Sequence, residues 1–322
     1  MSFYDNFETY DQCAPAGVLL PKINIEDRYY KELGIPSSSS NLKFLKKLCW
    51  DNMKAKGFGK DDTVYIDRLK MELDILEELG FIDYILLNWE VLNFCREENI
   101  PTGPGRGSAA GSLVLYFLGV TKVDPIKYDL FFERFVSRSR AKKIEGKDGQ
   151  TYLDGSLLAD VDNDIAYDRR SEVIEYIKRK YEGRTCKILN LVTLSGKLCI
   201  KEVGKLVGLK DEEEMNMLSD HIPVMFGKVA PLHQAQEESE KIAQWAKENP
   251  ESFEIAIKLE GLIKNTGVHA SGIAISHHKL TDICPIQKTK EGDLISCYDM
   301  NWIAELTVKF DILGLKTLTV LN

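Results

Sequence analysis

Residues 157–165 read Leu-Leu-Ala-Asp-Val-Asp-Asn-Asp-Ile, and this stretch decides the fold expected for the rest of the chain. Asp160, Asp162 and Asp164 occupy every second position, and alternate residues of a strand point to one face. Carboxylates on one face, with neighbouring Cα atoms roughly 6.5–7 Å apart, repel one another unless a cation holds them. Hard oxygen ligands at this spacing suit Mg²⁺. The alternative is an exposed acidic turn, because Asp and Asn favour turns.

The composition is that of an ordinary globular protein, with 44% apolar and 29% charged residues in a chain of 322. This length predicts one large or two modest domains. The sequence contains no apolar run long enough to span a bilayer and no signal peptide, so we expect no membrane association. The seven cysteines form no C-x-x-C pair. This pattern argues against a zinc site or a disulfide scaffold and favours a reducing cytoplasm.

The net charge of −8 argues mildly against a nucleic-acid partner, because proteins that bind phosphates are usually basic. Net charge averages over the whole surface, however. A cluster of carboxylates at a metal site and a basic face elsewhere are compatible with the same total.

Hydrophobic periodicity predicts amphipathic helices over residues 41–56 and 63–79, and mostly helical structure over residues 196–264. A helix over residues 84–98 is rich in large apolar side chains and is expected to be buried. Residues 138–153 are polar, and their Lys-Asp-Gly turn signal indicates an exposed hairpin or loop. Short strands return from about residue 265. The order strand, helical insertion, strand predicts an α+β domain with a helical subdomain inserted into it.

Residues 101–112, Pro-Thr-Gly-Pro-Gly-Arg-Gly-Ser-Ala-Ala-Gly-Ser, are the only glycine-dense stretch and precede a predicted helix. Glycines let backbone N–H groups approach a ligand closely, and a helix N-terminus attracts anions. Arg106 adds a charged fork, and Ser108 is expected at the cap position of the helix, so a triphosphate is a natural ligand. The stretch is neither a P-loop nor a strong dinucleotide fingerprint. The alternative is a simple glycine-rich turn.

A second acidic strand is expected near the end of the chain, where residues 306–313 read Leu-Thr-Val-Lys-Phe-Asp-Ile-Leu. Alternation places Lys309 and Asp311 together on one face. A lone Asp at the end of a strand is usually structural, but an Asp beside a Lys is of more interest in a chain that also has an acidic strand and a phosphate loop.

Five sequence blocks in a fixed order carry a resemblance to a known family. They are 101–135, 160–182, 193–209, 267–275 and 308–321, and they include GPGRGSAAGS, FFERF, TLSGK, GVHASGIAI and KFDILGL. The chain resembles the C-family bacterial replicative DNA polymerases of the DNA polymerase III alpha-subunit type. The resemblance implies a polymerase-beta-like nucleotidyltransferase palm with an inserted helical thumb. Its expected limits are residues 1–170 for the first part of the palm, 171–264 for the thumb and 265–322 for the second part of the palm.

The resemblance assigns a metal site to the acidic residues. Asp160 and Asp162 match the first two aspartates of the family's Pro-Asp-x-Asp-x-Asp-Phe motif, and Asp311 matches the third catalytic aspartate in Phe-Asp-x-Leu-Gly-Leu. These three are expected to hold two Mg²⁺ ions, for which Mn²⁺ can substitute. Asp164 matches the last aspartate of the motif and is not expected to be a ligand. His269 aligns with a palm histidine, for which packing in the core is the favoured interpretation.

The resemblance also assigns a nucleotide site. Gly107 and Ser108 match the Gly-Ser pair that grips the incoming triphosphate, and Arg106, Arg134 and Lys309 fall where the family places phosphate contacts. The implied reaction adds a dNTP to a primer 3′-hydroxyl on template DNA through two-metal-ion catalysis. It depends on positioning and electrostatic stabilisation rather than on a covalent intermediate.

Three lysines recur at helical spacing in the expected thumb, namely Lys197, Lys201 and Lys205. They are candidates for a stripe that follows the DNA backbone. The alternative is a solvated helix face.

The chain departs from the family motif at Ala159, Asn163 and Ile165, which stand in place of a proline, an apolar residue and a phenylalanine. Residues 137–158 are also longer than the family's link by roughly fifteen residues, and an exposed insertion accounts for them because loop closure cost grows slowly with length.

Nothing in the sequence matches the family's N-terminal phosphoesterase-like domain, and the chain stops before the expected fingers. We therefore expect one half of a split polymerase, of bacterial or bacteriophage origin, that acts in the cytoplasm of a bacterium or a phage-infected host. A second polypeptide would carry the fingers, and replisome proteins are further candidate partners. One alternative is a non-catalytic palm remnant that scaffolds or regulates a replisome. Another is a template-independent nucleotidyltransferase.

Overall fold

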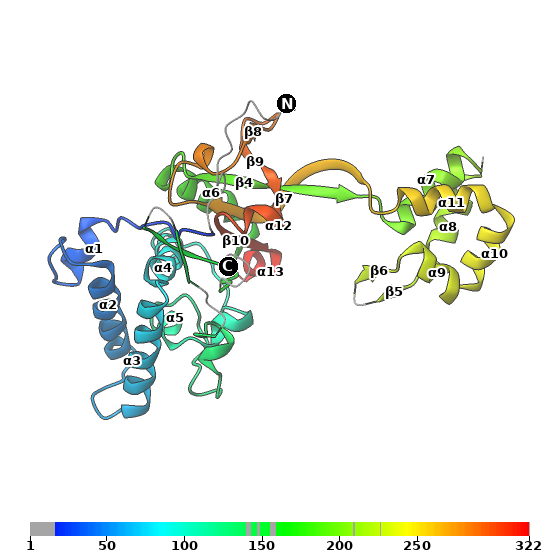
Figure 1. The fold of residues 1–322 in the computed structure, drawn as a ribbon. Helices are drawn as coiled ribbons and strands as arrows, with labels where there is room; N and C mark the ends of the chain where they lie inside the picture. The colour runs from blue at the N-terminus through cyan, green and yellow to red at the C-terminus, as the bar shows by residue number, and fades with distance from the viewer. Residues whose placement is uncertain are drawn as a thin grey trace. The chain divides into compact units, whose positions relative to one another are not determined.

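The computed structural model describes residues 17–139, 143–146, 149–154, 159–208, 210–225 and 227–321. Contacts between Cα atoms divide the chain into two units. Unit 1 comprises the residues up to Leu189 and those from His269 onward, and unit 2 comprises Asn190–Val268. The expected combination of helices and strands is confirmed, and the main sheet is mixed (Figure 1).

Unit 1 begins with helices that form most of its core. They are α1 (Asp27–Glu32), α2 (Asn41–Ala55), α3 (Thr63–Glu78), α4 (Ile82–Glu97), α5 (Leu113–Phe117) and α6 (Arg170–Lys180). Ser40 caps α2 by accepting a hydrogen bond from the Lys43 amide at 3.3 Å, a role for which serine is strongly preferred. Gly80 follows α3 with a φ of +77°, which only glycine adopts at low cost.

Helix α4 is the central element of this core. Most of its side chains are buried, which explains a sequence that is apolar on nearly every face. Asp83 lies in the first turn of α4 but does not cap the helix. Its carboxylate instead accepts hydrogen bonds from the Ile23 amide at 3.3 Å and from the side chain of Asn41 at 2.5 Å, so it fastens the N-terminal segment to α2.

A six-stranded sheet of order β3-β10-β7-β4-β9-β8 packs against these helices. Its strands are β3 (Asn163–Ala166), β4 (Thr185–Thr193), β7 (Ile263–Ile275), β8 (Ile286–Lys288), β9 (Leu294–Asp299) and β10 (Val308–Leu315). Strand β10 runs parallel to β3 and antiparallel to β7, and β9 runs parallel to β4 and antiparallel to β8. Helix α6 contacts both α4 and β10, so it connects the helical core to the sheet through the strand that lies between β3 and β7.

Short elements complete unit 1. They are η2 (Gly107–Gly111), η3 (Phe132–Arg134), η5 (Tyr167–Arg169), η6 (Leu280–Asp282), α12 (Met300–Ile303), α13 (Lys316–Val320), β1 (Lys143–Glu145) and β2 (Thr151–Leu153). Strands β1 and β2 form the antiparallel hairpin expected in 138–153, and β1 is fully exposed. Two residues of the predicted turn, 147 and 148, lie outside the described residues.

Unit 2 is helical and has a core of its own. It contains α7 (Gly196–Leu206), α8 (Glu212–Ser219), α9 (Leu232–Glu238), α10 (Glu240–Glu248), α11 (Pro250–Leu259) and the hairpin of β5 (Val224–Met225) and β6 (Lys228–Val229). Ile200, Leu232, Ile242 and Ala256 are fully buried in this core. Its limits differ from the expected 171–264, because α6 and the first part of β4 pack within unit 1.

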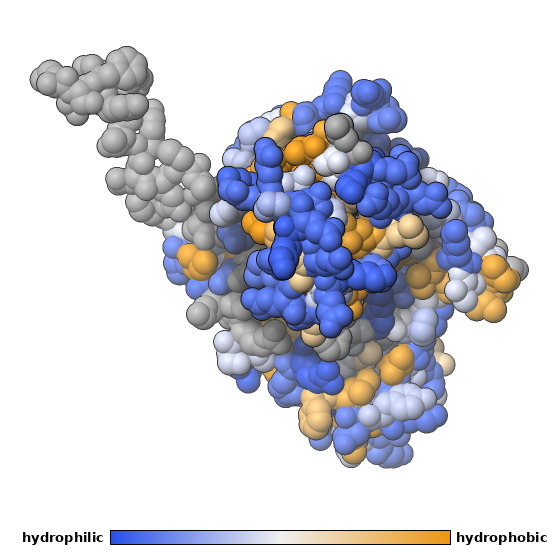
Figure 2. Space-filling model, turned by 90° about the vertical axis from the view of Figure 1, so that its right-hand side faces the viewer, coloured by the Kyte–Doolittle hydropathy of each residue, from blue (hydrophilic) through white to orange (hydrophobic). Residues whose placement is uncertain are grey.

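The surface shown in Figure 2 is mainly hydrophilic, with separate apolar patches. Among the described residues, the helices are all too short or too polar to cross a bilayer.

Candidate metal centre and phosphate site

The acidic segment approaches the sheet in an extended conformation just before β3. Val161 and Asn163 are buried in this segment, whereas Asp160 is exposed and Asp162 half-buried. The predicted alternation therefore holds for Asp160 and Asp162 but not for Asp164, which is buried in β3, and the regular strand begins only at Asn163. The two carboxylates consequently lie on the side of the segment that faces away from the core.

Strand β10 brings the third carboxylate to this segment. Ile312 pairs with Asn163 in parallel register, which places Asp311 beside the end of the acidic segment. One carboxylate oxygen from each of Asp160, Asp162 and Asp311 lies within 4.8 Å of the other two. These three side chains could therefore bind a metal ion, since clustered carboxylate oxygens are the ligands of hard divalent cations.

The cluster is electrostatically unfavourable by itself. The partly enclosed position of Asp160 is the main cause that raises the pKa of its carboxyl, and the negative charges of Asp311 and Asp162 raise it further. The cations Lys309 and Arg106 act in the opposite direction. A group that repels its neighbours in this way gains stability from a bound cation.

Each of the two cations pairs with a carboxylate. Lys309 Nζ lies 2.7 Å from Asp311 Oδ2, which agrees with the predicted placement of both residues on one face of the strand. Arg106 Nε lies 3.2 Å from Asp162 Oδ2 and 3.7 Å from Asp164 Oδ1. Asp164 is only 8% exposed and stands beside Arg106, outside the group of three that could hold a metal.

The first part of the glycine-rich stretch runs along the free edge of β3. The Gly103 amide donates to the Asp164 carbonyl at 2.9 Å, and the Ala166 amide donates to the Pro101 carbonyl at 3.0 Å. A Cβ on Gly103 would lie 2.8 Å from the Cβ of Asp164, so only glycine allows this approach. The acidic segment thus lies between β10 on one side and the glycine-rich stretch on the other.

The second part of the stretch turns at Gly107, whose φ of +65° favours glycine. A Cβ there would lie 4.0 Å from Asp162 Oδ2, so the turn is adjacent to the acidic cluster. The expected helix cap at Ser108 is wrong. Residues Gly107–Gly111 form a 3₁₀ turn, and Ser112 is the residue that caps α5, by accepting from the Leu115 amide at 3.3 Å.

Glu72 of α3 is a residue of this region that the sequence analysis missed. It is fully buried, and its carboxylate accepts hydrogen bonds from the Leu113 and Val114 amides, each at 3.0 Å. Arg68 Nε donates to the same carboxylate at 2.6 Å. Burial raises the pKa of Glu72, while the two amides and Arg68 lower it.

The N-terminus of α5 therefore already has an anion of the chain itself. Within the glycine-rich stretch, the groups that could contact a phosphate are therefore Arg106 and the turn at Gly107–Gly111. The signal for Glu72 in the sequence was a charged residue among the apolar positions Leu69, Leu73 and Leu76.

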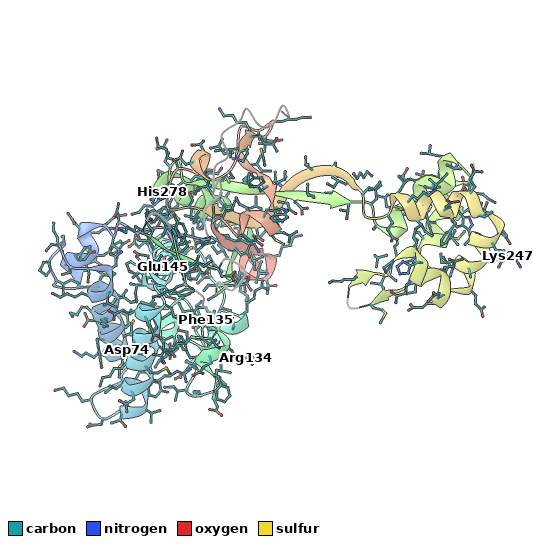
Figure 3. The ribbon with its side chains drawn as sticks, viewed as in Figure 1. Asp74, Arg134, Phe135, Glu145, Lys247 and His278 are labelled. Carbon is teal, nitrogen blue, oxygen red and sulfur yellow. The ribbon has the colours of Figure 1, made fainter. Side chains whose placement is uncertain are left out.

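The remaining candidate residues lie at different places. Arg134 is exposed at the end of η3, next to the buried Phe135, and η3 contacts η2 (Figure 3). His269 is half-buried, and its Nδ1 accepts from the Gly272 amide at 2.8 Å and from the Ser271 amide at 3.3 Å. Its burial lowers its pKa. Since the Ser271 hydroxyl donates to Asp311 Oδ1 at 3.3 Å, His269 supports the backbone behind the acidic cluster.

The three lysines of the expected stripe belong to α7 in unit 2. Lys197 lies 3.4 Å from Asp220, and Lys205 lies 3.7 Å from both Glu202 and Glu212. Within the described part of the chain, Lys201 has no ion pair. Two of the three are therefore partly neutralised by neighbouring acids.

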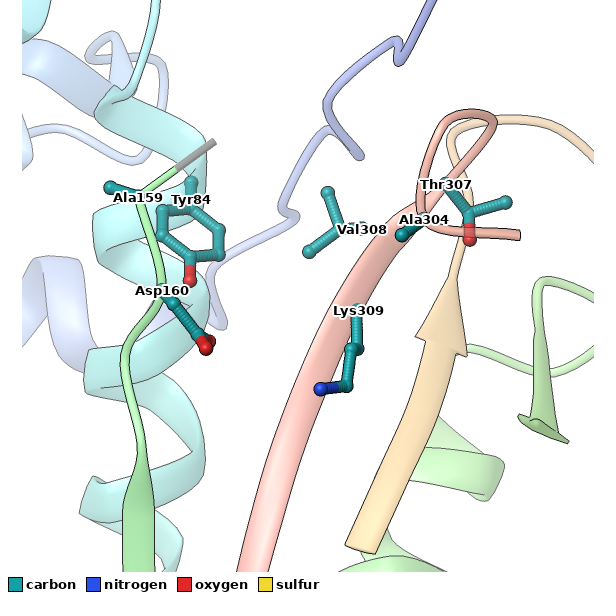
Figure 4. Close-up of a pocket in the computed structure, with 7 residues that line it drawn as sticks. All are labelled: Tyr84, Ala159, Asp160, Ala304, Thr307, Val308 and Lys309. Carbon is teal, nitrogen blue, oxygen red and sulfur yellow. The ribbon is translucent and has the colours of Figure 1, made fainter. Parts of the chain in front are cut away.

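A small pocket of about 140 Å³ opens beside the acidic cluster (Figure 4). Asp160 and Lys309 point toward each other across it, and Tyr84 of α4 lies next to Asp160. Burial and then the charge of Asp160 raise the pKa of Tyr84, so its hydroxyl is a neutral group at physiological pH.

The chain is similar in sequence to a known protein family over most of its length. The family model described as the bacterial DNA polymerase III alpha NTPase domain matches residues 43–314. DNA polymerase III subunit alpha of Bacillus subtilis (strain 168) is 35% identical over 292 residues, which cover 89% of this chain and 24% of the relative. The same subunit of Aquifex aeolicus (strain VF5) is 30% identical over 353 residues, covering 99% of this chain and 27% of the relative. That of Thermus aquaticus is 36% identical over 264 residues, covering 80% and 20%. The chain thus spans about a quarter of the length of the curated relatives it matches.

Proposed function

The chain belongs to the family of bacterial DNA polymerase III alpha subunits, and from this premise we propose that it supplies the catalytic palm of a template-directed DNA polymerase. The observation that carries the proposal is the meeting of Asp160, Asp162 and Asp311, whose oxygens lie within 4.8 Å of one another. Polymerase-beta-like palm topology is part of the proposal, and the mixed sheet is compatible with it.

The donor set fits the metal that this chemistry requires. All three ligands are carboxylates, and burial together with the charges of Asp311 and Asp162 raises the pKa of Asp160, as expected for a site that gains from a divalent cation. We propose two Mg²⁺ ions, with Mn²⁺ as a substitute. When bound, they would lower the pKa of the primer 3′-hydroxyl and neutralise the triphosphate.

The chain's own residues would orient the reactants around this centre. The turn at Gly107 and Ser108 presents backbone amides next to Asp162, and Arg106 supplies a guanidinium whose side chain is about half exposed. Lys309 lies on the other side of the cluster, from where its ammonium can reach a phosphate. We propose that these residues bind the incoming dNTP, with exposed Arg134 as a further contact.

Unit 2 is proposed to act as the thumb. Its helix α7 presents Lys197, Lys201 and Lys205 at a spacing suited to the phosphates of primer–template DNA. The fingers, and with them the second wall of the nucleotide pocket, would come from a second polypeptide. Other replisome proteins and a location in a bacterial or phage-infected cytoplasm complete the proposal.

A nucleotide-binding measurement tests the metal and phosphate sites of the isolated chain. We expect a fluorescent dNTP analogue to bind in the presence of Mg²⁺ or Mn²⁺, and Asp160→Ala to weaken binding at least about tenfold, as loss of a metal ligand does. Asp282→Ala, which removes an exposed acid on η6, is the matched control. Equal binding by all three proteins would favour a non-catalytic palm remnant.

Primer extension tests the reaction and the division of the polymerase. The chain is assayed on a labelled primer–template, alone and with a second polypeptide carrying fingers, for which the gene immediately downstream is the first candidate. We expect synthesis only with both chains and none with Asp162→Asn. Robust synthesis by this chain alone would contradict the split arrangement, and extension without template would indicate a template-independent nucleotidyltransferase.

A further inference from the structure

A buried pair of asparagines connects α4 to the acidic segment. Asn88 is 0% exposed and Asn163 is 3% exposed, and the Asn163 side-chain amide donates to Asn88 Oδ1 at 3.1 Å. Burying an amide costs free energy unless its hydrogen bonds are made. Leucine would fill such a core position without that cost, so two facing amides indicate a function beyond filling space.

The other hydrogen bonds of the pair reach the backbone on both sides. Asn163 Nδ2 also donates to the Val161 carbonyl at 3.2 Å, and Asn88 Nδ2 donates to the Tyr84 carbonyl at 2.9 Å. Val161 is the residue between Asp160 and Asp162. The pair thus connects the Val161 peptide, which lies between Asp160 and Asp162, to helix α4.

The asparagine pair lies at the point where the hydrogen-bonded pairing of β3 with β10 begins. The pairing of β3 with β10 starts at Asn163 opposite Ile312, and the two aspartates precede it. The orientation of the two aspartates therefore depends on what holds Val161, whose side chain is buried in the core of unit 1, whereas Asp160 and Asp162 are more exposed. A rotation of this peptide would turn both carboxylates away from Asp311.

We infer that Asn88 and Asn163 are positioning residues, which hold the Val161 peptide so that Asp160 and Asp162 face Asp311. This inference rests on the proposed function of the acidic cluster. Neither amide touches a carboxylate of the cluster, so the effect acts through the backbone. A purely structural role predicts instead that any well-packed replacement of the pair preserves the site.

Hydrogen exchange measures the proposed restraint without any metal. The proteins are wild type, Asn88→Leu, Asn163→Leu and the double variant, with Asn41→Leu as the matched control because its amide ties α2 to the Ile23 carbonyl at 3.0 Å. We expect exchange in the peptide 159–166 to be about tenfold faster in all three pair variants, the factor that corresponds to one lost net hydrogen bond. In the control this peptide should exchange as in wild type. Unchanged exchange in the double variant would overturn the inference.

Metal affinity separates positioning from packing. The double variant leaves no side-chain amide unpaired, and only the Val161 and Tyr84 carbonyls lose a side-chain donor, so we expect it to unfold at a urea concentration only slightly below that of wild type. We expect it nevertheless to bind Mn²⁺ about 10–100-fold more weakly, the range seen when outer groups that orient metal ligands are removed. A double variant that binds Mn²⁺ as tightly as wild type and is equally stable would contradict the positioning role of the two asparagines. If wild type itself bound no Mn²⁺, the proposed metal site would fail, while the exchange of 159–166 would still decide the inference.

Discussion

The buried carboxylate of Glu72 offers a quantitative test of how the glycine-rich stretch is held. Its Oε1 accepts from Arg68 Nε at 2.6 Å and from the Leu113 amide at 3.0 Å, and its Oε2 accepts from Ser112 Oγ at 2.9 Å and from the Val114 amide at 3.0 Å. The substitution Glu72→Gln keeps the shape of the side chain. It removes the charge and replaces one accepting oxygen by a donor.

The magnitude follows from these contacts. Two of the four donors lose their acceptor, whichever way the new amide is turned, and a buried donor left unpaired costs about 1–3 kcal/mol. Arg68 loses its counter-ion but still donates to the Gly111 and Leu130 carbonyls at 2.9 and 3.0 Å. At that cost for each of the two donors, we expect a loss of about 2–6 kcal/mol in the free energy of unfolding, a range that includes the ~3–5 kcal/mol typical of breaking a buried ion pair.

Urea unfolding followed by tryptophan fluorescence measures this loss. Glu77→Gln on the same helix is the matched control, because its ion pair with Lys46 at 3.2 Å is exposed and should contribute less than about 1 kcal/mol. The double variant Arg68→Met/Glu72→Leu should recover much of the stability, since it removes both charges together. A Glu72→Gln protein within about 0.5 kcal/mol of wild type, no more affected than a surface variant, would refute the reasoning.

Three further perturbations test other parts of the structure. Gly103→Ala should destabilise the chain by about 1–3 kcal/mol in urea unfolding, because the new Cβ would lie 2.8 Å from the Cβ of Asp164. Two lysines lower the pKa of Asp293. Wild type should therefore be more stable than Asp293→Asn, and this difference should be at its maximum above about pH 4, the ordinary pKa of Asp. In an acid titration the difference should disappear as the pH falls through the lower pKa that Asp293 has in the folded state. Ile242→Ala, in the core of unit 2, should cost about 2–5 kcal/mol, measured through the fluorescence of buried Trp245.

Each of these tests has a result that contradicts it. Gly267→Ala is the control for the first, because a Cβ there meets nothing within 4 Å, and equal effects of both alanines would remove the steric argument. For Asp293, a stability difference that stays unchanged throughout the acid titration would show that its ion pairs with Lys178 and Lys187 do not stabilise the folded chain. For unit 2, a variant that unfolds like wild type would show that its buried cluster contributes little.

Short-range patterns in the sequence predicted the parts of the site that depend on local geometry. The alternation of Asp160 with Asp162, and of Lys309 with Asp311, follows from the two-residue period of extended backbone, and the structure keeps both. The helices could also be predicted from the sequence, because their apolar positions repeat at helical spacing.

Contacts between distant residues could not be predicted in this way. Glu72 lies forty residues before its partner Ser112, and Asn88 lies 75 residues before Asn163. Nothing local distinguishes Ser108 from Ser112 as a helix cap, since the choice depends on the 3₁₀ turn that the glycines form. Likewise, α6 belongs to unit 1 because it packs against α4 and against β10, which is distant in the sequence.

The central claim is that three carboxylates from two neighbouring segments form one metal site, and crystals of this chain soaked in Mn²⁺ test it most directly. The account predicts an anomalous difference peak within coordination distance of Asp160, Asp162 and Asp311 in wild type, and its loss in Asp311→Asn. A fully soaked crystal with no peak at this cluster, or with a peak that persists in Asp311→Asn, would contradict it.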